Sequence, residues 1–452
     1  GVSLTTLDEN DQAKDFYERA LEIRLKELGP EHVDVASTYA NLGNLHSALG
    51  DTDQAKEYYE RALEIQLKKL GPEHVHVANI YISLGNLHSA LGDTDQAKGY
   101  YERALEIQLK KLGPEHVDVA NTYNSLGSLH SGMDDADQAK DYYKRALEIR
   151  LKKLGPEHVH VASTYGNLGN LHSELGETDQ GKDYYKSALQ IQLKKLGPEH
   201  VHVASTYNNL GILHNALGDT DEAKDCYKRA LEIRLKKLGP EHVHVAKIYG
   251  NLGSLHSALG ETDQGKDYFK RALEIRLKKL GPEHVDVANT YNNLGSLHSG
   301  MGDTDQGKDY YKRALEIRLK KLGPEHVHVA STYGNLGKLH SELGETDQAK
   351  DYYKRALEIQ LKKLGPEHVD VANTYNGLGN LHSSTLNDTD QAKDYYKRAL
   401  EIRLKQLGPE HVDVANSYNN LGNLHSHLGD TDEAKDCYKR ALEIQMKQLG
   451  PE

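Results

Sequence analysis

The string LGPE recurs along the chain at an almost constant spacing and divides the whole sequence into repeats. Its proline returns every 42 residues from Pro30 to Pro366, then after 43 residues at Pro409 and after 42 at Pro451. These positions account for all 11 prolines, so proline occurs only between repeats. A repeat of this length cannot bury its apolar residues alone, so we expect neighbouring repeats to stack into an elongated array.

Each repeat carries two apolar patterns with helical spacing. The first pattern proceeds at steps of four and three residues through Val35, Tyr39, Leu42, His46 and Leu49. The second pattern comprises Ala55, Tyr59, Ala62, Leu63, Leu67 and Leu70. We expect Gly50 to end the first helix in the left-handed conformation, and Asp51 with Gln54 to cap the second helix. The sequence therefore predicts one antiparallel helix pair per repeat and an all-α fold.

The repeats define the domain organisation. Residues 1–30 hold a partial repeat, a lone second helix from about residue 9 to 28, and residues 31–452 hold ten complete repeats. The ninth pair has one inserted residue in SSTLNDTD from Ser383, where Asn387 stands for the usual turn glycine. Some variants recur 168 residues apart, such as Glu174 and Glu342, which indicates duplication of a four-repeat block. Because the chain starts without Met and stops where another first helix should begin, we expect it to be part of a longer protein.

Charge and cysteine content exclude several classes of partner. The formal net charge is −12, from 56 basic and 68 acidic residues, which disfavours binding to nucleic acid or to an anionic membrane surface. No apolar stretch is long enough to cross a bilayer. Cys226 and Cys437 occupy the same position in two distant repeats and cannot meet in a linear array. We therefore expect free thiols and a reducing, cytoplasmic environment.

One set of positions has the spacing of a known signature: Tyr39, Leu42, Gly43, His46, Ala55, Tyr59 and Ala62. In this pattern the chain resembles the tetratricopeptide repeats, with Tyr in place of Trp and His in place of Tyr. Its 42-residue form, with LGPEHVDVA and NNLG, is similar to the repeats of kinesin light chain and nephrocystin-type proteins. The resemblance implies a right-handed superhelical solenoid that serves as a scaffold or adaptor for proteins or extended peptides. Further domains of the parent chain are also expected partners.

Histidine is abundant, but its pattern favours packing over chemistry. Of the 26 histidines, ten lie in the first apolar pattern, such as His46, and ten more lie in the turn between repeats, such as His32. Five HVH triplets place two histidines near a helix start, as at His74 and His76, where we expect the rings to point apart. A catalytic site is normally singular, whereas these residues recur in nearly every repeat. The sequence predicts no enzyme activity, no metal site and no cofactor.

Asparagines form the candidate binding set. In the families that this chain resembles, the first helices line a concave groove, and an Asn two residues after the signature Tyr contacts the main chain of a bound peptide. The positions carried over, with two neighbouring groove residues, are Asn41, Asn167, Asn170, Asn209, Asn251, Asn293, Asn335, Lys338 and Asn420. The column is interrupted at Ser83, Ser125 and Gly377, so we expect a ligand along repeats four to eight. Solvated filler is the competing interpretation.

Other features leave two rival functions open. Only Lys247 and Lys338 stand as lysines in the groove, which disfavours a terminal-carboxylate clamp of the kind used by chaperone-tail-binding relatives. The run containing Arg234, Lys236 and Lys237 is interpreted as exposed cations at a helix C-terminus. One rival function is a ligand-sensing array attached to a nucleotide-binding switch domain. The other is a structural spacer without a dedicated ligand, which the near-identity of the repeats favours.

Overall fold

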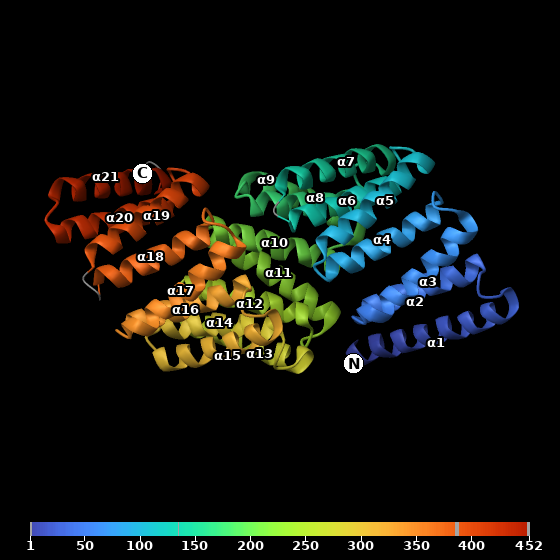
Figure 1. The fold of residues 1–452 in the computed structure, drawn as a ribbon, viewed down its shortest axis with the longest axis horizontal. Helices are drawn as coiled ribbons and strands as arrows, with labels where there is room; N and C mark the ends of the chain where they lie inside the picture. Colours follow the sequence, from blue (N-terminus) through green and yellow to red (C-terminus); the bar gives the residue numbers. More distant parts are fainter. Residues whose placement is uncertain (1, 134, 385–387, 450–452) are drawn as a thin grey trace. The chain divides into compact units, whose positions relative to one another are not determined.

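The computed structural model describes residues 2–133, 135–384 and 388–449, and all secondary structure in these ranges is helical (Figure 1). The helices of the first unit are α1 (Val2–Leu28), α2 (Val33–Leu49), α3 (Thr52–Leu70), α4 (Val75–Ala90), α5 (Thr94–Leu112), α6 (Val117–Ser131), α7 (Ala136–Leu154), α8 (Val159–Glu174), α9 (Thr178–Leu196), α10 (Val201–Leu217) and α11 (Thr220–Leu238). Those of the second unit are α12 (Val243–Ala258), α13 (Thr262–Leu280), α14 (Val285–Gly300), α15 (Thr304–Leu322), α16 (Val327–Glu342), α17 (Thr346–Lys363), α18 (Val369–Ser384), α19 (Thr389–Leu407), α20 (Val412–Leu428) and α21 (Thr431–Leu449). None of the helices in those ranges is long and apolar enough to span a bilayer. The predicted all-α class is confirmed.

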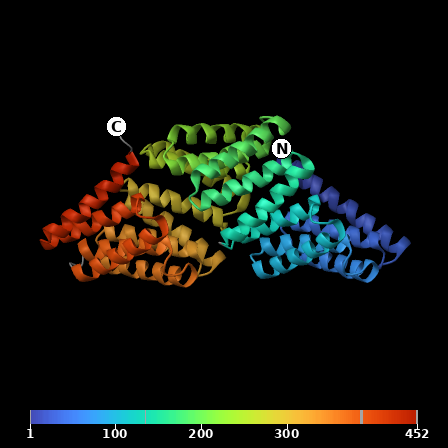
Figure 2. The ribbon, with the colours of Figure 1, turned by 90° about the horizontal axis from the view of Figure 1, so that it is seen from above.

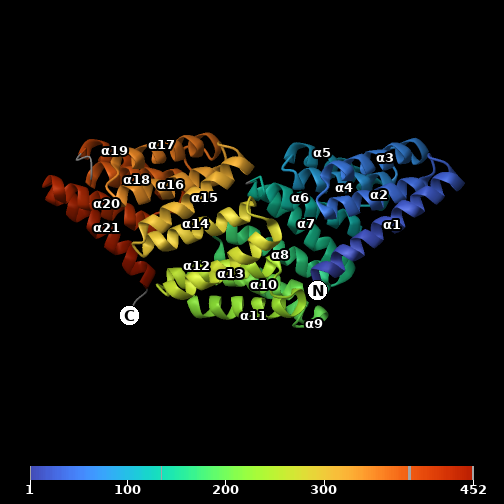
Figure 3. The ribbon, with the colours of Figure 1, turned by 90° about the horizontal axis from the view of Figure 1, so that it is seen from below.

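The helices form two units, Gly1–Pro240 and Glu241–Glu452. Within each unit, the first (even-numbered) helix of a repeat packs against its own second helix, which packs against the first helix of the next repeat. Figures 2 and 3 show this side-by-side stacking in each unit from two opposite sides. First helices of consecutive repeats also touch, as α2 and α4 do, whereas no comparable contact joins consecutive second helices in the described ranges. The first helices therefore line the inner side of each unit.

Glycine and tyrosine set the distance between the two helices of a pair. The ring of Tyr59 on α3 is buried against α2, and a Cβ atom added to Gly43 would lie 2.6 Å from that ring. Gly85 and Tyr101 repeat this contact one repeat later, also at 2.6 Å. A larger residue at either glycine would push the helices apart. The close crossing expected at Gly43 is therefore confirmed.

The turn inside each pair joins the two helices through a histidine and a carboxylate. Gly50 adopts φ 80°, and one oxygen of Asp51 accepts from the Gln54 N–H, as predicted. The other Asp51 oxygen lies 3.2 Å from Nδ1 of His46, a buried ring that packs on the second helix. The packing role predicted for His46 is confirmed, and its link to Asp51 is new. Leu49 is 42 % exposed, because the helix ends before this residue can turn toward the core, and Asn387 lies outside the described residues.

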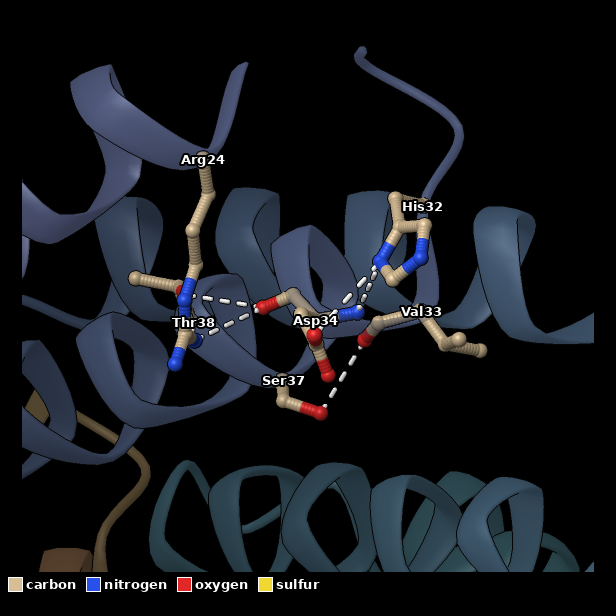
Figure 4. A network of polar contacts seen from close by, with 6 residues as sticks. All are labelled: Arg24, His32, Val33, Asp34, Ser37 and Thr38. Atoms are coloured by element: carbon tan, nitrogen blue, oxygen red, sulfur yellow. Dashed lines mark hydrogen bonds and ion pairs between the residues drawn. The ribbon is translucent and has the colours of Figure 1, made fainter. Parts of the chain in front are cut away.

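The turn between repeats has a capping residue that the sequence did not reveal. Nδ1 of His32 accepts from the Asp34 N–H at 3.2 Å, so His32 is the N-cap of α2 (Figure 4). The guanidinium of Arg24 on α1 donates to the Asp34 carbonyl at 3.0 Å and to the Thr38 hydroxyl at 2.6 Å. The preceding repeat therefore holds the start of the following first helix.

The HVH triplets differ from the prediction. The ring centroids of His74 and His76 are 4.8 Å apart, so the expectation that these rings point away from each other was wrong. The reason is that His74 occupies the extended N-cap position and turns back, where its Nδ1 accepts from the His76 N–H. Within the described ranges, no group of three or more His, Cys, Asp or Glu side chains is arranged to hold a metal ion.

Candidate groove along the first helices

The predicted binding residues all lie on first helices. In the first unit they are Asn41 on α2, Asn167 and Asn170 on α8, and Asn209 on α10; in the second unit they are Asn251 on α12, Asn293 on α14, Asn335 and Lys338 on α16, and Asn420 on α20. Asn41 and Lys338 are exposed and the others are half-buried. Since the first helices line the inner side of each unit, these residues belong to one kind of surface.

In the first unit, asparagines bond to one another from repeat to repeat. Nδ2 of Asn167 on α8 donates to Oδ1 of Asn124 on α6 at 3.1 Å. Nδ2 of Asn209 donates to Oδ1 of Asn170 at 3.0 Å, and the same oxygen accepts from the Tyr185 hydroxyl at 2.6 Å. These side chains therefore have fixed orientations, and Asn124 is a groove residue that the sequence analysis did not single out.

The second unit has the same kind of ladder. Nδ2 of Asn335 on α16 donates to Oδ1 of Asn292 on α14 at 3.1 Å, and Nδ2 of Asn420 on α20 donates to Oδ1 of Asn376 on α18 at 2.7 Å. Only the distance between adjacent first helices makes these bonds possible, so no pattern within one repeat could have predicted them. The recurrence of Asn one position before the column, as at Asn292, is the signal that was available.

A small pocket of about 220 Å³ lies beside Asn41 in the first unit, between α2 and α4. Its floor includes Gln66, a side chain only 4 % exposed whose Oε1 has no hydrogen-bond partner among the described residues. At the equivalent place three repeats later, Oε1 of Gln192 accepts from the Thr206 hydroxyl at 2.8 Å. The difference arises because Ile80 stands where Thr206 stands.

A larger pocket of about 460 Å³ lies in the second unit between α16 and α18. Two of the predicted residues, Asn335 and Lys338, line it, together with Tyr353 of α17. The two glycines in its wall, Gly334 and Gly377, each replace an asparagine found in other repeats. A Cβ atom on Gly377 would lie 2.7 Å from the Tyr353 ring, so the glycine opens the pocket above this tyrosine.

Buried arginines beneath the groove tie consecutive repeats together. Arg150 of α7 donates to the Thr164 hydroxyl of the next repeat at 2.6 Å and to Oδ1 of Asn121 in its own repeat at 2.8 Å. Arg318 repeats this arrangement in the second unit, with the Thr332 hydroxyl at 2.5 Å. Burial lowers the pKa of both Arg150 and Arg318 to about 10. These arginines are fixed parts of the groove floor.

Arg234 was wrongly interpreted as an exposed cation. It is only 6 % exposed, its Nη2 donates to the Ser205 hydroxyl at 3.2 Å, and burial lowers its pKa. Lys236 and Lys237 do lie in the last turn of α11, where both pair with Glu199. The error arose because the Arg position alternates between Arg and Gln and falls between apolar neighbours, a signal that was taken for part of a charged run.

Comparisons with known proteins agree with this geometry. The sequence profile described as "Tetratricopeptide repeat" matches residues 1–68, 53–110, 76–152, 118–193, 160–236, 244–320, 286–362, 328–405 and 386–447. No curated protein sequence matches the chain. Among solved structures, the chain is similar to a Rap protein complexed with Competence and Sporulation Factor, with 14% identity, a TM-score of 0.58 and coverage of 83% of this chain and 99% of that chain.

Two further solved structures are similar over shorter stretches. BtubC (BKLC) from P. vanneervenii has 25% identity and a TM-score of 0.41, covering 52% of this chain and 92% of that one. A putative kinesin light chain with nearly identical TPR-like repeats from Podosopora anserina has 19% identity and a TM-score of 0.40, covering 46% and 98%.

Stacked helix pairs with a polar inner surface define a class of helical repeat proteins that present an extended face. The chain belongs to the tetratricopeptide repeat family. Proteins of this family generally act as scaffolds for protein–protein interaction.

Proposed function

We propose that this chain is a scaffold or adaptor whose first helices hold extended peptides or protein segments in the groove of each unit. The observation that carries the proposal is the ladder of half-buried asparagines that are fixed by bonds to the preceding repeat, as at Asn167 and Asn209. A carboxamide has two donor hydrogens and an acceptor oxygen, so one bond to a neighbour leaves capacity for a ligand. The main chain of an extended peptide offers matching N–H and C=O groups at regular intervals.

The fold similarity to the Rap protein supports the same function, since that helical array was solved in complex with a separate ligand. A spacer without a ligand has no reason to vary on its inner surface. Three departures from the repeat pattern, Gly334, Lys338 and Gly377, nevertheless meet in one pocket. The free thiols Cys226 and Cys437 are consistent with a reducing compartment, and we propose that the protein works in the cytoplasm.

The test begins with a display library of random peptides selected on the full chain, followed by calorimetry of the selected peptides. Two double variants, Asn167→Ala with Asn209→Ala and Asn335→Ala with Asn420→Ala, address the two units separately. Each lost hydrogen bond costs about 1 kcal/mol, so we expect about 30-fold weaker binding to one of the two variants.

Charge reversals outside the groove, such as Lys69→Glu, serve as the control because Lys69 lies in the last turn of α3 and pairs with Glu31. Selected peptides that bind both double variants normally but lose affinity for the control would place the site on another face. Thermal melting of each variant shows whether it is folded.

A further inference from the structure

The pocket between α16 and α18 contains a buried hydroxyl group that lacks the partner found in neighbouring repeats. The Tyr185 hydroxyl donates to Oδ1 of Asn170 at 2.6 Å, and the Tyr396 hydroxyl donates to Oδ1 of Asn380 at 2.8 Å. The residue equivalent to Asn170 beside Tyr353 is Lys338, which has no acceptor atom. Tyr353 is 6 % exposed, lines the pocket, and its hydroxyl has no partner among the described residues.

The residue facing this hydroxyl from the next repeat is also absent. In the first unit, Asn209 reaches back to Asn170 at 3.0 Å and closes the space beside Tyr185. Gly377 takes the place of Asn209 in the second unit, and its missing side chain leaves the Tyr353 hydroxyl open to the pocket. Two substitutions, in adjacent repeats, therefore remove an internal acceptor and open a path for an external one.

The charges around the pocket are predominantly positive. Lys338 is exposed, and its contact with Glu342 at 3.9 Å is a solvent-exposed pair of little strength. Arg403 lies in the floor, and its guanidinium donates only to uncharged oxygens, namely Oδ1 of Asn373 at 2.8 Å, the Ser417 hydroxyl at 2.8 Å and the Asp413 carbonyl at 3.1 Å. One carboxylate, Asp370, lines the rim. A buried cation without a carboxylate contact favours an anion nearby.

We propose that this pocket binds the carboxylate of an acidic side chain in a peptide held along the groove of the second unit, an inference that rests on the proposed function. The carboxylate accepts from the Tyr353 hydroxyl in the place that Oδ1 of Asn170 occupies beside Tyr185, and it also accepts from the Lys338 ammonium group. The volume of about 460 Å³ leaves room for the side chain and for water.

The experiment uses the full chain and a positional-scanning library of random peptides that are acetylated at the N-terminus and amidated at the C-terminus. The caps remove terminal charges, so selection of Asp or Glu reports on an internal side chain. We expect enrichment of an acidic residue at one position. Replacing that residue by its amide, Glu→Gln or Asp→Asn, should weaken binding about tenfold, as expected for a charge-assisted hydrogen bond.

Variants of the pocket identify the residues that select the acid. Lys338→Asn gives the pocket the residue found at Asn170, and Tyr353→Phe removes the hydroxyl; both should abolish the acidic preference. Tyr185→Phe removes the equivalent hydroxyl in the first unit and should leave the preference intact. If peptides bind in the groove without an acidic preference, or keep it in both pocket variants, the inference is wrong and the proposed function stands. If the amide peptide binds equally well, the pocket takes a neutral acceptor instead. If no library peptide binds, the proposed function itself fails.

Discussion

The unpartnered oxygen of Gln66 leads to a stability prediction with an internal control. This oxygen is buried under the groove without a donor, and Ile80 occupies the place where Thr206 serves Gln192. A buried carbonyl group without a partner costs about 1–3 kcal/mol. Methionine matches the length of glutamine without its polar atoms, so Gln66→Met should stabilise the contact between α3 and α4 by about 1 kcal/mol.

The matched change Gln192→Met should have the opposite sign. It removes the acceptor of the Thr206 hydroxyl, which retains only the His202 carbonyl at 3.3 Å, and should cost about 0.5–1.5 kcal/mol. Because a repeat array does not unfold as a single unit, native-state hydrogen exchange of α4 and α10 is the appropriate assay. A change of 1 kcal/mol alters protection about fivefold. If Gln66→Met lowers protection in α4 as much as Gln192→Met does in α10, the unpaired oxygen carries no cost and the reasoning is refuted.

Three further predictions concern packing, metal and pH. Gly85→Ala should destabilise its repeat by about 1–3 kcal/mol because its Cβ would lie 2.6 Å from the Tyr101 ring, whereas Gly99→Ala in α5, with no atom within 4 Å, should stabilise it by up to about 1 kcal/mol in urea unfolding. A strong chelator should leave the melting temperature unchanged, and a drop of several degrees would contradict the packing role of the histidines. Burial lowers the pKa of His340 below its usual 6.5, so the unfolded chain binds the proton more readily; stability should be complete above pH 6.5 and fall as the pH decreases below it. A melting temperature that rises between pH 6.5 and 5.5 would have the wrong sign.

The parts of the structure that depend on one repeat alone could be predicted from the sequence. The apolar spacing, the φ of Gly50 and the cap at Asp51 depend on a few consecutive residues, and Gly43 marks a contact inside one helix pair. His32 escaped prediction because its capping role comes from Nδ1, whereas the usual capping residues are Ser, Thr, Asp and Asn.

Contacts between repeats could not be predicted in the same way. The bond from Asn167 to Asn124 joins residues 43 positions apart, and the bond from Arg150 to Thr164 joins two repeats across a turn. Each needs the separation of adjacent first helices, which the packing of Tyr and Gly fixes only after the whole stack has formed. The sequence therefore placed the asparagines on the correct helices but interpreted Arg234, which looks like a surface residue in isolation, incorrectly.

Near-identity of the repeats makes the exceptions informative. The segments α6–α9 and α14–α17 carry the same contacts 168 residues apart: Asn167 with Asn124 and Asn335 with Asn292 are both at 3.1 Å. The framework is thus held constant, and a substitution at one copy can be judged against the other. Asn170 closes the space beside Tyr185, whereas Lys338 leaves Tyr353 without an acceptor. Since the two frameworks are otherwise alike, the opening at Tyr353 is a property of the groove surface and not of the fold, which is where selectivity for one ligand over another has to reside.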